Sequence, residues 1–282
     1  MQRQILSGKH RALRTIALNL PMALIGLLFV VPFYWLVITS FRLEGDIMVI
    51  PPRFLPYPST LTNYVTLLSK FNFGLYFANS FIIAVLGLIG QTFSCSMGGF
   101  VFARLKFPLK RTLFYLLLST MMIPGQVTLI PTFVIFNMLK LTNTFVPLIL
   151  PAYLGGAFGV FLCRQFFLTV PNELEEAAKL DGSDSVGIYW RIFLPIAKPT
   201  LATLALFAFM YHWNDLLGPV IYITDTSKRT ITVALAMFQD TLRVSRGTIM
   251  AGALLSITPL LIVYVFAQQF FVSGMITSGF KE

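Results

Sequence analysis

The sequence has few charged residues. Charged side chains make up 11% of its 282 residues, whereas a soluble domain carries about 25%. Hydrophobic residues make up 56%, and the mean hydropathy is +0.79. A soluble domain of this length would need much more polar surface. The composition therefore excludes an ordinary soluble domain and predicts an integral membrane protein.

Residues that carry chemistry are also scarce. The only cysteines, Cys95 and Cys163, lie in apolar runs with no Cys or His cluster nearby, which argues against a disulfide framework or a zinc site. Neither the G-x-x-x-x-G-K-[ST] nor the H-E-x-x-H pattern occurs. We therefore expect no catalytic site, no metal site and no cofactor in this chain. The net charge of +10 is assigned to basic loops at a membrane rather than to nucleic-acid binding.

Long apolar runs are abundant, and each of six is long enough for one helix across a bilayer. Because the runs are continuous and do not alternate, a β-barrel is excluded. The first run is too long for a signal-peptide core, so no cleavable signal is expected. We predict an all-α membrane protein with an N-terminal segment at residues 1–14 and a six-span domain at 15–280. The expected spans are residues 16–40, 77–103, 112–138, 143–164, 199–223 and 247–272.

Basic residues near the span ends predict the orientation. With the N-terminus in the cytoplasm, most of the 21 Lys and Arg residues lie inside, four of them within residues 104–111. Both termini are then cytoplasmic. The outer loop at 224–246 contains a short apolar stretch, 231–238, which either dips into the outer leaflet or packs on the helices. The remaining long segment, 165–198, is a cytoplasmic loop.

The first half of this loop is predicted to be a short helix. Pro171 suits a first helical turn, or Asn172 and Glu175 form a capping box instead. Glu175 and Lys179 are an i,i+4 pair in the favoured order. Gly182 is the expected end of the helix.

The second half is predicted to form another short helix. Ser183, Asp184 and Ser185 are candidate N-caps. The helix is expected to run to about Phe193 and to stop before Pro195. Two short helices joined at an angle would form a rigid projection, or knob, to which a soluble motor protein could bind.

One pattern in this loop identifies a family. It consists of Glu176, Ala177 and Ala178, then Gly182 after three residues, then Ile192, Leu194 and Pro195 after nine more. In residues and spacing the pattern resembles the signature loop of ABC importer permeases. The flanking sequence, from about residue 63 to 280, resembles the carbohydrate-uptake group, specifically the smaller permease of maltose-type and glycerol-phosphate-type systems. Ser183 departs from the alanine of many relatives.

The resemblance implies a multi-subunit importer in a prokaryotic cytoplasmic membrane. The partners would be a second permease in a heterodimer, two cytoplasmic ATPases that bind ATP and Mg²⁺, and an extracytoplasmic sugar-binding protein. The chain itself would not be an enzyme. A cysteine at Ala178 is expected to crosslink to the ATPase. The residues expected to couple to the ATPase are Glu173, Glu176, Ala177, Ala178, Asp181, Gly182, Leu194 and Pro195.

Polar and aromatic residues within the spans are candidates for a solute path. Asp215 is the only acidic residue inside a span, and such a group is a functional candidate by default. It serves either a pathway or gate, or an ion pair at the permease interface. The others could equally be polar contacts between helices, and His212 either packs in the interior or faces the path. The candidates are Asn79, Gln91, Gln126, Asn137, Tyr153, Trp213, Asn214 and Asp215.

Prolines within the spans are either ordinary kinks or bends around a pathway. Broken backbone at membrane depth is tolerated where protein or a water-filled cavity satisfies it. Pro124 and Gly125, beside Gln126, are the strongest candidate for a local break.

Two other functional classes remain open. A self-sufficient secondary transporter or channel should transport its solute alone, without ATP. A membrane scaffold or enzyme subunit should show no substrate-dependent phenotype. Both require the spacing of residues 176–195 to be accidental.

Overall fold

The computed structural model describes residues 2–239 and 244–279, and for 2–17 and 270–279 it describes the helical backbone only. Within these residues the regular elements are all helices. The chain divides into two compact units. The first runs from α1 to Phe71 and includes the start of α15; the second runs from Asn72 to Met237 and includes α15 from Ser256 onward.

Four helical segments are long and apolar enough to cross a membrane, and two bent helix pairs raise the number to as many as six. The count of six spans stays a prediction, because one of the bent pairs includes residues 185–196, which were predicted to lie in the loop. The bent pairs are Lys110–Met122 with Gly125–Met138, at 100°, and Ser185–Ile196 with Lys198–Trp213, at 80°. The four long segments are Leu18–Ser40, Phe73–Arg104, Val146–Thr169 and Arg246–Gln269.

The first unit contains α1 (Gln2–Ser40), α2 (Glu44–Ile47), α3 (Thr62–Lys70) and the start of α15 (Arg246–Gly279). Since α1 begins at Gln2, the segment predicted to precede the first span is helical where it is described. The buried side chain of Asn63 donates to the carbonyls of Ser40 (2.9 Å) and Arg42 (2.7 Å). This side chain therefore ties α3 to the end of α1.

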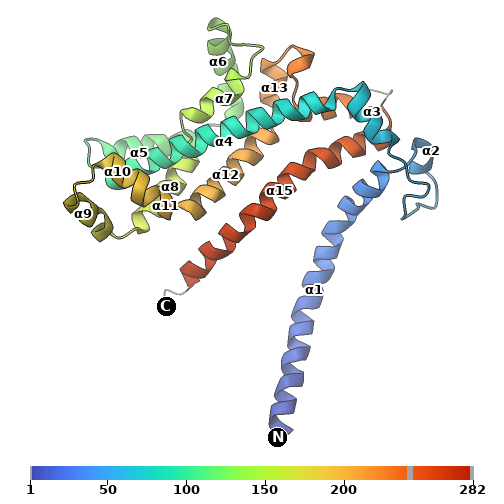
Figure 1. Ribbon diagram of the computed structural model, residues 1–282, viewed down its shortest axis with the longest axis horizontal. Helices are drawn as coiled ribbons and strands as arrows, with labels where there is room; N and C mark the ends of the chain where they lie inside the picture. The colour runs from blue at the N-terminus through green and yellow to red at the C-terminus, as the bar shows by residue number, and fades with distance from the viewer. Residues whose placement is uncertain (1, 240–243, 280–282) are drawn as a thin grey trace. The chain divides into compact units, whose positions relative to one another are not determined.

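The second unit is built around α4 (Phe73–Arg104). Helices α8 (Ala157–Thr169) and α12 (Lys198–Trp213) run beside it (Figure 1). The remaining elements are α5 (Lys110–Ser119), η1 (Thr120–Met122), α6 (Gly125–Met138), α7 (Val146–Tyr153), α9 (Asn172–Leu180), α10 (Ser185–Ile188), η2 (Tyr189–Phe193), α11 (Leu194–Ile196), α13 (Leu217–Tyr222), η3 (Thr226–Lys228) and α14 (Ile231–Gln239).

Small residues allow α4 and α8 to approach closely. A Cβ on Gly99 would lie 2.5 Å from Cys163 Cβ, and one on Gly159 would lie 2.6 Å from Cys95 Sγ. Both cysteines are free and buried, as expected for small apolar side chains. Close approach through small residues is the usual way in which membrane helices pack.

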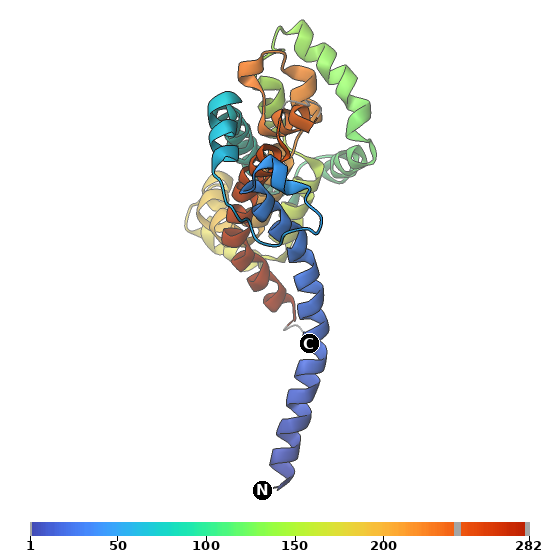
Figure 2. The same ribbon diagram turned by 90° about the vertical axis from the view of Figure 1, so that its right-hand side faces the viewer.

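The backbone breaks in unit 2 only partly follow the prediction. The break expected at residues 122–126 is confirmed: η1 ends at Met122, α6 begins at Gly125, and the bend is visible in Figure 2. The predicted fifth span, 199–223, is wrong as a single helix, because α12 ends at Trp213 and α13 begins at Leu217. An apolar run predicts that a segment lies within the membrane, but it does not predict that the segment is one continuous helix.

The short apolar stretch at 231–238 forms most of α14. Its first residue is fully buried, and the Ile231 N–H donates to Ser80 Oγ at 2.8 Å. The start of α14 therefore packs on α4, which decides between the two alternatives for this stretch in favour of packing on the helices.

Candidate functional site: a helical knob and a polar cavity

Helix α9 ends in a complete Schellman motif. Gly182 has φ = +82°, its N–H donates to the Lys179 carbonyl at 3.0 Å, and the Ser183 N–H donates to the Ala178 carbonyl at 2.9 Å. A left-handed residue at this position is favourable for glycine and costly for most others. The predicted stop at Gly182 is confirmed, and its geometry sets the direction of the following segment.

The start of α9 differs from the capping-box alternative. Pro171 is the N-cap residue, so it precedes the first helical turn in which it was expected, and Asn172, the expected cap, is the first helical residue. The Asn172 Oδ1 atom accepts instead from Arg104. Glu175 forms the predicted i,i+4 pair with Lys179 (2.6 Å). The Asn172 side chain therefore binds Arg104 of α4 and does not form the capping box with Glu175.

Arg104, the last residue of α4, connects three parts of this unit. Its Nη2 atom donates to the carbonyls of Phe167 (2.6 Å) and Val170 at the end of α8. Its Nη1 atom lies 3.8 Å from Glu175 Oε2. Its guanidinium group also lies over the Phe193 ring, 4.8 Å from the centroid. A rigid planar cation can serve several acceptors at once, so Arg104 holds α9 against the ends of α4 and α8.

The second half of the loop is helical for longer than predicted. Asp184 caps α10 by accepting from the Gly187 N–H at 2.8 Å, which confirms it as the N-cap. The predicted stop before Pro195 is wrong, because a π-helix leads into α11 and the helix ends at Ile196. Pro195 lies inside this continuous helical stretch, directly after the π-helix, and has no N–H to donate to the preceding turn.

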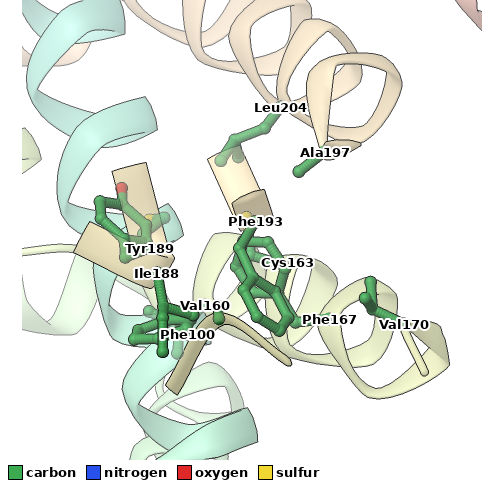
Figure 3. Packing of buried hydrophobic residues seen from close by; sticks show 12 residues of the cluster. Phe100, Val160, Cys163, Phe167, Val170, Ile188, Tyr189, Phe193, Ala197 and Leu204 are labelled. Atoms are coloured by element: carbon green, nitrogen blue, oxygen red, sulfur yellow. The ribbon is translucent and has the colours of Figure 1, made fainter. Parts of the chain in front are cut away.

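A buried cluster supports the knob (residues 172–196) from inside the unit. The Phe193 ring lies 5.1 Å from that of Phe100 and 5.5 Å from that of Phe167 (Figure 3). Tyr189 Oη and Ser96 Oγ share a buried hydrogen bond of 2.7 Å. Side chains of α4, α8, α12 and the knob thus form one close-packed core, in which a displacement of any member is transmitted to the others.

The residues of α9 divide into two faces. Ala178 is 7% exposed and belongs to the buried cluster, whereas its neighbour Ala177 is exposed. The crosslink expected at Ala178 therefore loses its geometric basis. Leu180 is 89% exposed. The outward-facing candidates on the knob are Glu173, Glu176, Ala177, Asp181, Gly182 and Pro195, while Leu194 is half-buried.

A cavity of about 680 Å³ lies elsewhere in the same unit, bounded by α4, α6, α7, α12 and α13. Asp215 lines it and accepts from the Gly218 N–H at 3.1 Å. A cavity lined by hydroxyl, amide and carboxylate groups can exchange hydrogen bonds with a polar solute. Its polar side chains are Gln91, Gln126, Thr128, Thr132, Tyr211, His212, Asp215 and Tyr222.

Of the predicted path residues, only Gln91, Gln126 and Asp215 line this cavity. Asn79 is buried and donates to the carbonyls of Ser227 and Arg229, each at 2.9 Å. Trp213 is buried, and its Nε1 donates to the Ser256 carbonyl at 3.0 Å. These two residues are structural because their polar groups are already paired.

The other three candidates also lie off the cavity. Asn214 donates to the Met210 carbonyl at the end of α12 (2.8 Å). The Tyr153 ring packs directly on Gly90 and fills the space that a Cβ at position 90 would need. Asn137 is exposed on α6. Polarity within a span is therefore not sufficient to identify a path residue.

Some residues of the site were not singled out from the sequence. Arg104 was counted only as one of several basic loop residues. Thr128 and Thr132 were overlooked, although their i,i+4 spacing places both on one face of α6 with Gly125. This spacing is the signal that could have identified the two threonines. Tyr211, four residues before Asp215, was also overlooked.

Comparison with known proteins agrees with this geometry. A family model described as "Binding-protein-dependent transport system inner membrane component" matches residues 95–277. The chain is 34% identical over 257 residues to a probable ABC transporter permease protein, YurM, of Bacillus subtilis, covering 89% of this chain and 83% of that protein. It is 31% identical over 269 residues to the arabinooligosaccharides transport system permease protein AraQ of Halalkalibacterium halodurans, covering 94% and 95%.

A further relative is the sn-glycerol-3-phosphate transport system permease protein UgpE of Yersinia pestis, 29% identical over 266 residues, with 91% and 94% covered. The fold matches a chain in the crystal structure of a bacterial ABC transporter involved in alginate import, with a TM-score of 0.82 at 22% identity and 91% and 96% covered. The chain has the architecture of an ABC importer permease. It belongs to the family of inner membrane components of binding-protein-dependent transport systems and is the permease subunit of an ABC importer.

Proposed function

We propose that this subunit forms half of the translocation path for a sugar or sugar-like solute and couples to cytoplasmic ATPases through the knob. The observation that carries the coupling role is the contrast between the two sides of residues 172–196. Their inner side belongs to the buried core, while Leu180, Val186 and Trp190 are 89%, 63% and 50% exposed. Exposed apolar side chains on a polar loop are typical of a docking surface.

The knob transmits motion in this proposal. ATP closes the ATPase dimer, which moves α9; Arg104 and the Phe193 cluster pass the displacement to α4, α8 and α12. The two permeases then rock between inward-open and outward-open states. Each step requires a ligand or partner that binds the two states differently. The outward-facing carboxylates of Glu173, Glu176 and Asp181 would contact the ATPase.

The sugar assignment rests on the relatives and on the cavity. The names of two relatives state transport of arabinooligosaccharides and of glycerol 3-phosphate. The cavity adds hydrogen-bonding side chains at the depth where a solute would pass. ATP and Mg²⁺ are assigned to the partner ATPases, so no cofactor is proposed for this chain.

The partners follow from the same proposal. A second permease would complete the path in a heterodimer, two ATPases would bind the cytoplasmic face, and an extracytoplasmic binding protein would deliver the solute. A solved structure of an alginate ABC transporter holds a periplasmic protein bound to an alginate pentasaccharide, and the fold matches it with a TM-score of 0.65. Both termini of this chain would lie in the cytoplasm of a prokaryotic cell.

Copurification tests the proposal. The tagged chain is extracted from its native membranes in mild detergent, and the copurifying proteins are identified. Recovery of a second permease and an ATPase supports the importer. Recovery of this chain alone, stable and able to transport in liposomes without ATP, would instead establish a secondary transporter.

A further inference from the structure

A second pocket lies in unit 2 between the end of α4, α5 and α8. Its volume is about 500 Å³, and residues at the end of α4, along α5 and on α8 line it. Three of these residues are cations: Lys110 and Arg111 on α5 and Arg164 on α8. The path and coupling roles proposed above use none of the three.

Among the described residues, no carboxylate pairs with the three cations of this pocket, and Lys110 Nζ donates only to the carbonyls of Ala103 and Leu105. The ion pairs found within the described residues use other cations. Arg164 Nε donates to the Phe102 carbonyl at 3.1 Å, and Arg111 Nε donates to Tyr115 Oη at 3.2 Å. Within the described part of the chain, the terminal nitrogens of both arginines have no hydrogen-bond partner. These donors remain available to a ligand.

The position of two of the cations is unfavourable without an anion. Lys110 and Arg111 are the first two residues of α5, and its first turn holds no acidic residue. Cations at a helix N-terminus oppose the macrodipole, whereas a negative group there is stabilised by it. An anion in the pocket would therefore pair with the cations and with the dipole together.

The walls of the pocket are aromatic and fix the cations in place. The Arg164 guanidinium lies 4.2 Å from the centroid of the Phe114 ring, and that of Arg111 lies 5.5 Å from the centroid of the Tyr115 ring. Tyr115, which is 55% exposed, Leu118 and Phe161 continue the apolar wall. The site thus joins three cations to apolar side chains in one pocket, which matches the chemistry of an amphiphile.

We propose that this pocket binds the phosphate headgroup of an anionic phospholipid, whose acyl chains lie along the apolar wall formed by Tyr115, Leu118 and Phe161. Basic pockets between membrane helices recognise such headgroups. A free phosphate ion shares the headgroup chemistry, but it would leave the adjoining apolar surface uncovered. The inference needs only that α5 begins at the membrane surface. It does not depend on the coupling role of the knob, so either proposal can fail alone.

Lipid binding to the purified full-length chain tests this site. The affinity for a fluorescent phosphatidylglycerol is measured in detergent for the original chain and for Arg111→Gln, Arg164→Gln and Lys106→Gln. Each pocket variant should bind about fivefold more weakly, the usual effect of one cation near an anionic lipid. Lys106 is the matched control, since it is an exposed cation of the same loop outside the pocket. Its variant should bind like the original chain.

Several results would overturn the site. Equal weakening by Lys106→Gln would show general surface attraction. Equal affinity for phosphatidylcholine would remove the anionic selectivity. Displacement of the lipid by millimolar inorganic phosphate would assign the pocket to a soluble anion. Arg111 is exposed, so Arg111→Gln decides the question if Arg164→Gln does not fold.

Discussion

Arg104 connects the membrane helices to the knob at the residue level. It serves two carbonyls at the end of α8, the side chain of Asn172 and the carboxylate of Glu175. Hydrogen bonds that involve a charged group contribute about 1.5–3 kcal/mol each. Loss of the guanidinium group should therefore loosen α9 without removing any surface that faces a partner.

We expect Arg104→Gln to lower solute uptake while ATP hydrolysis by the assembled importer continues. The reason is that a displacement of the knob would no longer be transmitted to α4 and α8. Arg104→Lys should give an intermediate result, since a point charge cannot replace the planar fork. The measurement is the ratio of solute imported to ATP hydrolysed in proteoliposomes. Lys106→Gln, two residues away and exposed, is the control and should leave this ratio unchanged. An unchanged ratio in Arg104→Gln would contradict the role.

Gly182 provides a second test at this scale. Proline cannot adopt the observed φ of +82° and lacks the N–H that bonds to Lys179. Gly182→Pro should abolish coupling while membrane insertion persists. Asparagine tolerates the left-handed region, so Gly182→Asn should retain most uptake. The two variants are compared by uptake at equal membrane abundance, and normal uptake in Gly182→Pro would exclude the coupling role.

Asp215 lines the cavity and also accepts the Gly218 N–H. Asparagine keeps an acceptor oxygen there but removes the charge. Asp215→Asn should therefore leave thermal stability unchanged and reduce uptake about tenfold, as expected for one lost charge-assisted hydrogen bond to the solute. Asp215→Ala should lose stability as well. If Asp215→Asn transports normally and only Asp215→Ala is impaired, the carboxylate is structural.

At the level of elements, α9 is a helix with one buried and one exposed side. A cysteine at 177 or 180 should react with a water-soluble maleimide and crosslink to the ATPase, because Leu180 is 89% exposed and Ala177 is also exposed. A cysteine at the buried Ala178 should react much more slowly. Labelling rates in native membranes check this contrast. Equal rates at all three positions would mean that α9 is not docked on the core.

The same contrast explains which parts of α9 were predictable. Its end at Gly182 and its Glu175–Lys179 pair depend on neighbouring residues, and the structure confirms both. The burial of Ala178 depends on Phe167 and Phe193, which join it in one cluster through α8 and η2. Helical periodicity defines which residues share a face, but it does not specify which face meets the protein.

At the level of the whole molecule, orientation is the remaining prediction. Positive residues predict that α9 lies in the cytoplasm and that residues 42–70 lie outside. Ile50 is 92% exposed, so Ile50→Cys should react with an impermeant reagent added outside intact cells. Leu180→Cys should react only after the cells are opened. The reverse pattern would invert the topology and remove the basis for ATPase coupling.

The sequence by itself determined the class of the protein, the number of apolar runs and the family. These properties follow from composition, from runs of about 20 residues and from the spacing of residues 176–195, all of which are local along the chain. The break at Pro124 and the cap at Asp184 belong to the same group.

Only the tertiary structure decided which polar residues meet. Asn79 and Gln91 lie on the same helix, yet one is paired with the backbone of residues 227–229 and the other lines the cavity. The role of Arg104 likewise arises from segments more than 60 residues further along the chain. Such contacts depend on how helices pack, and in an apolar chain the packing depends on the shapes of many small side chains rather than on any single pattern.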